Sequence, residues 1–245
     1  MEFLIPILFS LIAFIYSSVG LGGGSSYTAL LVIIGIAFPF IPTTSLMLNL
    51  LVSFIGIINF WRNGHGNLKL ILPFLITSIP MTFIAGTIVL PELIFQIFLL
   101  ITLIFVALRI YVVGELKLTL QLSSTQKWIF TLGLGAVLGF IAGALGIGGG
   151  IYLVPFLVMT GLASQKEASA SGVLFIWVNS LTGLIARTQA GTFNAQLILP
   201  LAGAVGVGGF FGSWFGSTKF SPHTIQKIMG GVIIIAIVFL LRKIL

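Results

Sequence analysis

Apolar residues fill long stretches of this chain and leave only short polar interruptions between them. A helix needs about 20 consecutive apolar residues to cross the hydrocarbon core of a bilayer, within a range of roughly 17–25. Measured against that length, the pattern predicts ten helical segments and an all-α polytopic membrane protein. The expected segments are 3–19, 28–42, 43–61, 70–90, 91–113, 128–147, 151–163, 168–186, 196–216 and 221–241.

Two glycine triplets, at 22–24 and 148–150, interrupt the apolar runs. Each glycine costs about 1 kcal/mol in a helix interior relative to alanine, so three in succession favour a break. Broken backbone at membrane depth persists only where protein or a water-filled cavity satisfies its polar groups. The segments 28–42 and 151–163, which follow the triplets, are short. We therefore expect glycine-broken helices or half-helices of re-entrant hairpins at these two places.

The triplets belong to a longer internal repeat. Gly22 and Gly148 lie 126 positions apart, and Pro73 and Pro200, each in the phrase Leu-Ile-Leu-Pro, lie 127 apart. A slowly drifting offset is what a duplication with small insertions leaves. The expected organisation is a first membrane repeat over 1–113, a polar linker over 114–127 and a second membrane repeat over 128–245.

The number of segments bears on the symmetry of the two repeats. Five segments per repeat is an odd number, so the second repeat would enter the membrane with the opposite polarity. The pattern thus favours an inverted repeat about an axis in the membrane plane. If each glycine hairpin is re-entrant, four spans per repeat would give parallel repeats instead. Matched breaks in corresponding positions are the best sequence pointer to a transporter's substrate site.

Composition and charge fix the class and an orientation. Only 6% of the residues are charged, 58% are hydrophobic and the mean hydropathy is +1.25, whereas soluble domains carry about 25% charged residues. The net charge of +7 reflects basic loops rather than nucleic-acid binding, because cytoplasmic loops are enriched in Lys and Arg. One predicted face holds most of these residues and is expected to be cytoplasmic, with both termini outside. That face receives Arg62, Lys69, Arg109, Lys117, Lys127, Lys166 and Lys219, and the other Arg187, Arg242 and Lys243.

Few side chains could carry chemistry inside the membrane. The chain has no cysteine and no aspartate, and its four glutamates lie at segment ends or in loops. His65 and His223 also lie in a loop and at a segment start. Hydrolysis would need a nucleophile with a base or a metal cluster. We therefore expect no enzyme, no cofactor, no metal site and no buried carboxylate relay.

The helix starts after the glycines favour binding of a small anion. Backbone N–H groups at a helix start have no partner one turn back, and the helix dipole adds about half a positive charge there. The alternative is close helix packing, for which membrane helices also use glycine and small polar residues. The candidate substrate-binding residues are Gly22, Gly23, Gly24, Ser25, Ser26, Asn49, Gly148, Gly149, Gly150, Ile151, Ser171 and Asn179.

Polar side chains in the third and eighth segments complete the candidate site. Asn49 and Asn179 each carry an amide that can donate to an anion, although such residues also bond neighbouring helices in membranes. Arg62 and Arg187 close the same two segments and would stand at opposite mouths. There each would either attract anions or anchor its helix at the interface.

These motifs resemble a known family. The phrases Gly-Leu-Gly-Gly-Gly at 20–24 and Gly-Ile-Gly-Gly-Gly at 146–150, with Pro155, Leu-Asn-Leu-Leu at 48–51 and Asn-Gly-His at 63–65, are similar to those of the TauE/SafE sulfite exporter family of membrane permeases. The resemblance covers essentially the whole chain. It implies transport of small anions, such as sulfite, sulfoacetate or related organosulfonates, by a protein embedded in the membrane lipid, across a prokaryotic inner membrane. The second triplet precedes Pro155 and the first does not precede a proline, so the half-sites are not equivalent.

The membrane potential suggests the direction of transport. A monovalent anion that leaves a cell gains about 2.3 kcal/mol per 100 mV of interior-negative potential. Export therefore requires no coupling ion, whereas uptake would require one and the chain offers no intramembrane carboxylate to carry it. We expect export by alternating access between the repeats. An anion channel and a non-transporting accessory subunit are the alternatives, and the sequence carries no signal for an oligomeric state.

Overall fold

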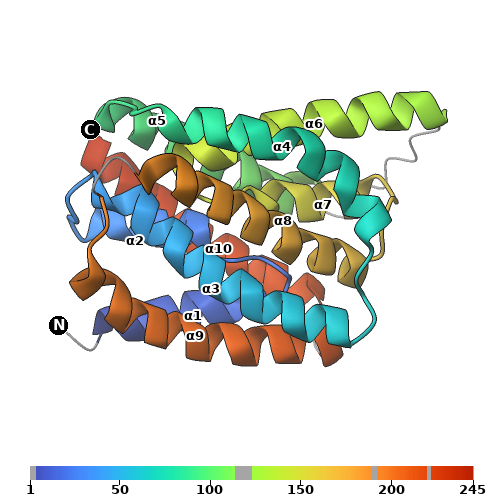
Figure 1. Cartoon of the computed structure of the whole chain (residues 1–245). Helices are drawn as coiled ribbons and strands as arrows, with labels where there is room; N and C mark the ends of the chain where they lie inside the picture. Colours follow the sequence, from blue (N-terminus) through green and yellow to red (C-terminus); the bar gives the residue numbers. More distant parts are fainter. Residues whose placement is uncertain (1–3, 114–122, 189–191, 220–221, 245) are drawn as a thin grey trace.

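A computed structural model describes residues 4–113, 123–188, 192–219 and 222–244, which form ten α-helices, one π-helical turn and no strand (Figure 1). The predicted all-α class is confirmed. Residues 114–122 of the predicted linker, with Glu115 and Lys117, lie outside the described residues, as do Glu2 and the side chain of His223. The helices are α1 Leu4–Ser17, α2 Gly24–Ile33, α3 Phe40–Arg62, α4 Leu68–Thr87, α5 Glu92–Leu108 with the π-helical turn η1 Arg109–Val113, α6 Ser124–Leu145, α7 Gly150–Met159, α8 Gln165–Arg187, α9 Ala195–Thr218 and α10 Pro222–Ile244.

Seven of the described helices are long and apolar enough to cross a membrane: α3, α4, α5 with η1, α6, α8, α9 and α10. The helices α2 and α7 have only 10 residues each, which confirms the short segments predicted after the glycine triplets. The first segment is also shorter than predicted, because α1 ends at Ser17 and not at residue 19. The chain turns there through Gly20, whose φ is +78°.

The predicted segment 28–42 was wrong in its bounds. The helix α2 already begins at Gly24 and ends at Ile33, and α3 begins at Phe40 instead of residue 43. Gly35 takes the left-handed conformation with a φ of +78°, which ends the helix. A continuous apolar run hides such a turn, because Val and Ile precede the glycine and Ile, Ala and Phe follow it.

The helices α3 and α8 lie at the centre of the bundle and are the most buried of the long helices (Figure 1). On one side α4 packs against α6 and α8, and on the other side α9 packs against α1 and α3. The helix α5 packs against α10. The short helices α2 and α7 pack against α3 and α8, so the glycine-containing loops before them are directed into the core.

The helix contacts recur between the two predicted repeats. The pair α4 and α6 corresponds to α9 and α1, α8 on α4 corresponds to α3 on α9, and α7 on α8 corresponds to α2 on α3. Single residues repeat in the same way. Gly56 lies against Val173, and Gly183 lies against Leu46, two contacts related by a shift of 127 positions.

Glycines at every fourth position let two of these helix pairs approach closely, the spacing expected for close packing in membranes. A Cβ added at Gly143 of α6 would collide with the carbonyl oxygen of Thr82 in α4, and one at Gly212 of α9 with that of Phe14 in α1. We call these rows the glycine stripes. They consist of Gly135, Gly139 and Gly143 on α6 and of Gly208, Gly212 and Gly216 on α9.

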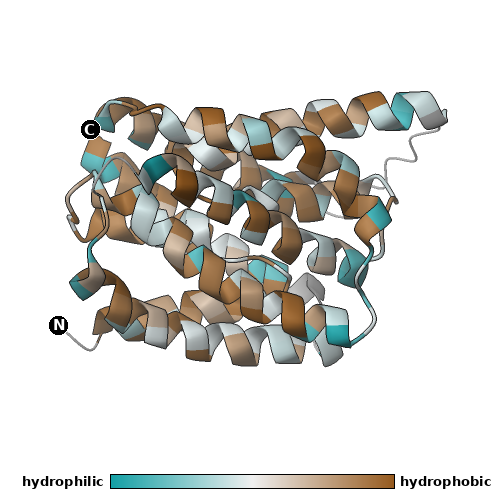
Figure 2. Ribbon diagram, in the orientation of Figure 1, coloured by the Kyte–Doolittle hydropathy of each residue, from teal (hydrophilic) through white to brown (hydrophobic). Residues whose placement is uncertain are grey.

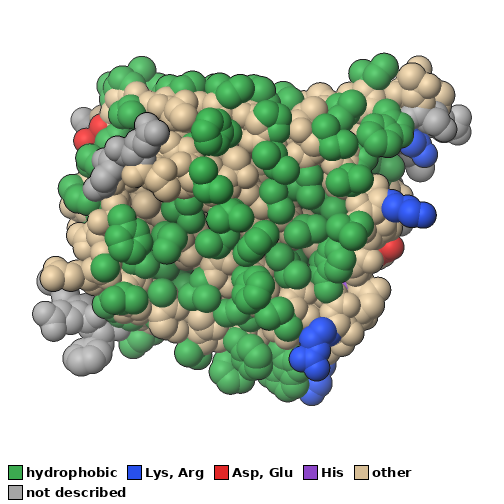
Figure 3. All heavy atoms as spheres, viewed as in Figure 1, with side chains coloured by type: hydrophobic (Ala, Val, Ile, Leu, Met, Phe, Trp, Pro, Cys, Tyr) green, Lys and Arg blue, Asp and Glu red, His purple; other side chains and the backbone are tan. Residues whose placement is uncertain are grey.

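The outer surface of the bundle is apolar and its charges lie at the ends. Figure 2 shows hydrophobic residues along the outward faces of the helices. In the face shown by Figure 3, Lys and Arg side chains gather at the right end, where α3 ends and α8 begins, while hydrophobic side chains cover the flank between the ends. This distribution is typical of a protein surrounded by lipid.

Candidate functional site

Two helices begin inside the protein at left-handed glycines. The N-cap of α2 is Gly23, with a φ of +93°, and the N-cap of α7 is Gly149, with a φ of +74°. Only glycine adopts this conformation without strain. Within the described residues neither helix start has a side-chain cap, and both lie in buried stretches of the chain. The first N–H groups of each helix are therefore buried donors without an intrahelical partner.

Asn49 of α3 lies between the two glycine-containing loops. A Cβ added at Gly22 would collide with Asn49 Oδ1, one at Gly24 would collide with Asn49 Nδ2, and one at Gly148 would lie 3.3 Å from Asn49 Nδ2. The same added Cβ at Gly24 would lie 2.9 Å from the carbonyl oxygen of Ile147, so the two loops also approach one another. The structure thus brings together predicted site residues that are about a hundred positions apart in the sequence.

The amide of Asn49 is buried and unpaired. Its side chain has 0% exposure, and neither Nδ2 nor Oδ1 has a hydrogen-bond partner among the described residues. Buried polar atoms are almost always paired, so each exception needs an explanation. An amide held at two uncapped helix starts is the arrangement expected where a ligand supplies the missing partners.

The serines of the first helix start are buried beside these groups. Ser26 shares a hydrogen bond of 2.6 Å with the hydroxyl of Tyr16, and Ser25 is 2% exposed. From α3, Ser45 donates to the carbonyl oxygen of Gly24 at 3.0 Å, which fixes the start of α2 against the centre of the bundle. Ser26 is therefore already bonded within the protein, whereas the N–H groups of α2 are not capped.

The second helix start has a different lining. Ile176 of α8 takes the place that Asn49 takes in α3, 127 positions earlier, and its Cγ2 would lie 2.8 Å from a Cβ at Gly148. Ser180 lies next to it, with its Oγ 3.1 Å from the same added Cβ and without a partner in the described part of the chain. Ser180 belongs to the polar residues predicted along the eighth segment, whereas Ile176 was missed, although the repeat offset of 127 positions from Asn49 points to it. The predicted residue Ile151 is 5% exposed in the first turn of α7.

Asn179 of α8 is directed at α4. Its Nδ2 donates to the carbonyl oxygen of Phe175 at 2.8 Å, and its Oδ1 accepts from Thr82 of α4 at 2.7 Å. Both amide atoms therefore serve helix packing. Ser171 is fully buried and its hydroxyl is unpaired within the described residues. The structure does not bring Asn179 into contact with the glycine-containing loops.

The two predicted arginines lie at opposite ends of the bundle. Arg62 ends α3 and is exposed, whereas Arg187 near the end of α8 donates from Nη2 to the carbonyl oxygen of Gly143 at 2.6 Å. Arg187 thereby caps the end of α6. It also lines a pocket of about 100 Å³ together with Pro42 and Ala144, and Pro42 touches Gly146 of the second loop.

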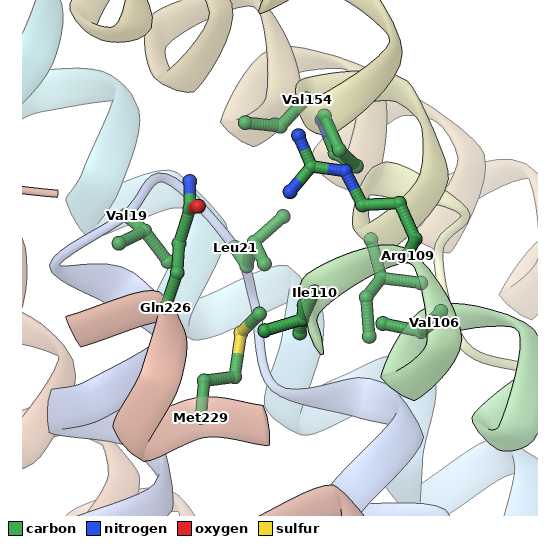
Figure 4. Close-up of a pocket in the computed structure, with 10 residues that line it drawn as sticks. Val19, Leu21, Val106, Arg109, Ile110, Val154, Gln226 and Met229 are labelled. Carbon is green, nitrogen blue, oxygen red and sulfur yellow. The ribbon is translucent and has the colours of Figure 1, made fainter. Parts of the chain in front are cut away.

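A smaller pocket lies on the other side of the loops. It has a volume of about 20 Å³, room for one water molecule. Figure 4 shows the guanidinium of Arg109 pointing into it, with Gln226 on the opposite side and Leu21 of the first loop between them. From the sequence, Arg109 was predicted only to mark the cytoplasmic face. The part of the chain that the structure describes holds no group of three or more His, Cys, Asp or Glu that could bind a metal ion.

Comparison with known proteins identifies the family. A family model described as "Sulfite exporter TauE/SafE" matches residues 5–240. The chain belongs to the TauE/SafE family. The resemblance predicted from the glycine motifs is therefore confirmed.

Bacterial relatives of this TauE/SafE protein are similar along almost the whole chain. It is 28% identical over 234 residues to the "Probable membrane transporter protein y4hK" of Sinorhizobium fredii (strain NBRC 101917 / NGR234), across 95% of each chain. It is 29% identical over 239 residues to the "Probable membrane transporter protein YjnA" of Bacillus subtilis (strain 168), across 89% of this chain and 91% of that protein. No solved structure matches it. As a TauE/SafE member the protein is a multi-pass membrane transporter and not an enzyme, as predicted.

Proposed function

We propose that this TauE/SafE protein exports small anions, sulfite or related organosulfonates, across the inner membrane of a prokaryotic cell. The family description "Sulfite exporter TauE/SafE" supports the substrate class. The observation that carries the proposal is the buried, unpaired amide of Asn49 at two uncapped helix starts. Backbone N–H groups and the dipoles of α2 and α7 favour negative charge there without a basic side chain in lipid.

We further infer that the two repeats are inverted. Each hairpin consists of a helix, a glycine-containing loop and a short helix: α1 with α2, and α6 with α7. In Figure 1 the turn after α2 lies at the left end of the bundle and the turn after α7 at the right end, so the two hairpins run in opposite directions. Three long helices follow each hairpin, α3 to α5 and α8 to α10, and three is odd. Re-entrant hairpins are therefore compatible with inversion where α1 with α2, and α6 with α7, each return to the face from which they start, although α6 alone is long enough to cross.

Pockets on either side of the loops support alternating access. The larger pocket, lined by Arg187, and the smaller pocket, lined by Arg109, both contain residues of the two predicted repeats. The buried glycine-containing loops lie between the two pockets. A rocking movement of one repeat against the other would open Asn49 to one pocket at a time. The proposed direction is outward, since an interior-negative potential drives an anion out of the cell.

The test is anion flux in proteoliposomes with an imposed potential. The purified protein is reconstituted with sulfite inside, and efflux is measured at interior-negative, zero and interior-positive potential. We expect efflux that saturates with concentration and rises when the interior is negative. An efflux rate that does not change with the potential contradicts export driven by the potential. An efflux rate that does not saturate with the sulfite concentration indicates a channel. No flux with sulfite or any sulfonate would indicate a non-transporting subunit.

A further inference from the structure

The amide of Asn49 offers both a hydrogen-bond donor and an acceptor at the candidate site. Nδ2 faces Gly24 at the start of α2, and Oδ1 faces Gly22. Turning the amide by half a rotation exchanges the two atoms and still leaves one of each. Within the described chain both atoms are unpaired, so a ligand must satisfy two opposite requirements.

The helix starts meet only one of these requirements. They supply N–H donors, which bind the negative oxygens of an anion, and Nδ2 of Asn49 adds another donor. The acceptor Oδ1 repels an anion that carries no hydrogen. Ser180 and Tyr27 carry hydroxyls beside the two loops, and in the described residues neither hydroxyl has a hydrogen-bond partner, so neither donates to Oδ1.

In the described structure no carboxylic acid side chain lies near enough to donate a hydrogen bond to Oδ1 of Asn49. The chain contains no aspartate, and the glutamates that the structure describes, Glu92 and Glu167, lie in the first turns of α5 and α8. These helix starts are at the ends of the bundle, away from the loops. A donor for Oδ1 must therefore arrive on the ligand.

We propose that the site at Asn49 selects singly charged oxyanions that carry their own O–H group over anions of equal charge and shape without one. The proposal rests on the anion site proposed above and narrows its substrates to hydrogen sulfite over organosulfonates, because a sulfonate group carries no O–H. The negative oxygens bind to the helix starts and to Nδ2, and the O–H of the ligand donates to Oδ1. The proton then crosses the membrane as part of the substrate, and the protein needs no proton relay.

Two matched pairs of anions test this selection. Hydrogen carbonate and nitrate are planar and singly charged, hydrogen sulfite and chlorate are pyramidal and singly charged, and only the first of each pair has an ionisable proton. Binding to the folded protein raises its thermal midpoint, which gives an apparent Kd for each anion in detergent. We expect the proton-bearing member of at least one pair to bind about tenfold more tightly, the ratio that one additional hydrogen bond gives.

Substitutions of two asparagines of α3 show whether the preference for proton-bearing anions depends on Asn49. Asn49→Leu should bind both members of each pair equally. Asn59→Leu, on the same helix, removes an amide that bonds Ser213 of α9, and it should keep the preference of the natural chain. Preference that survives in Asn49→Leu would overturn the assignment to Asn49.

The failure of this inference is distinguishable from the failure of the anion site. If the natural chain binds both members of each pair equally, the selection is wrong and the anion site stands. If none of the four anions raises the midpoint, the anion site itself is wrong. The comparison within the natural chain needs no variant, so it remains decisive even where Asn49→Leu does not fold.

Discussion

Ser169 of α8 donates a hydrogen bond of 2.7 Å to the carbonyl oxygen of Val19, and so ties the first glycine-containing loop to the central helix of the other repeat. Gly20 lies so close to Ser169 that an added Cβ would overlap its backbone. The corresponding contact joins Gly146 to Pro42. Because proline has no hydroxyl and no N–H, Pro42 cannot donate such a bond to the second loop.

Replacing Ser169 by alanine should loosen this anchor. The substitution leaves a buried carbonyl oxygen unpaired, which costs about 1–3 kcal/mol. Thermal unfolding in detergent should show a lower midpoint. Thr182→Ala is the control, because the hydroxyl of Thr182 bonds only to Val178 in its own helix, and it should change the stability by less than about 0.5 kcal/mol. Equal effects would contradict a specific role of the loop anchor.

The two central asparagines should respond in opposite ways to the same substitution. Asn179→Leu removes the bond from Thr82, whose hydroxyl can still donate to the carbonyl oxygen of Gly139, so the cost is that of one hydrogen bond, about 0.5–1.5 kcal/mol. Asn49→Leu removes an amide without a partner in the described chain, so it should leave the midpoint unchanged or raise it. Transport should follow the reverse order, with sulfite efflux lost in Asn49→Leu and retained by the folded fraction of Asn179→Leu. A large loss of stability in Asn49→Leu would indicate that its amide serves packing.

Valine at either N-cap glycine should abolish transport. Gly23 and Gly149 have positive φ values and crowded surroundings, so Gly23→Val and Gly149→Val displace the helix starts. Membrane insertion, followed by the amount of protein extracted from membranes, should stay intact. Gly64→Val is the control, since Gly64 has a φ of +77° and no atom within 4 Å of an added Cβ among the described residues. Flux that persists in both N-cap variants would refute the site.

Alanine substitutions along the glycine stripes should separate packing from helix propensity. Gly139→Ala and Gly212→Ala place a methyl group against the backbone of the facing helix, and overpacking of this kind costs about 1–3 kcal/mol. Gly133→Ala and Gly203→Ala meet open space in the described structure and should gain up to about 1 kcal/mol from better helix propensity. The thermal midpoints of the four variants distinguish the two effects. A higher midpoint in all four variants would mean that the glycine stripes do not pack closely.

The sequence was sufficient to predict the all-α class and most of the helices, because long apolar runs between polar breaks show where the segments lie. The offset between Gly22 and Gly148 indicates a duplication, and the division into two repeats stays a prediction. The ends were harder to predict where an apolar run conceals a turn. Gly35 lies among Ile, Ala and Phe, so nothing in the hydropathy distinguishes the turn after α2 from the helices on either side.

The site could be predicted only in part. Asn49 and the glycine triplets come together as one cluster, because the loops that carry them meet in the core. Asn179 looked equivalent by residue type, yet a shift of 127 positions places Ile176 opposite Asn49. Residue type indicates what a side chain can bond to, whereas the position along the helix decides which neighbour it meets. Whether the predicted residues bind substrate stays a prediction.

Both glycine stripes belong to the second repeat, and the helices they face, α1 and α4, belong to the first. The halves thus fit one another as complementary surfaces. The glycines leave room for the backbone of α1 and α4 to come into direct contact, so any larger side chain in a stripe would push the two halves apart. Which residues the second half tolerates there is set by the helix of the first half that lies against it.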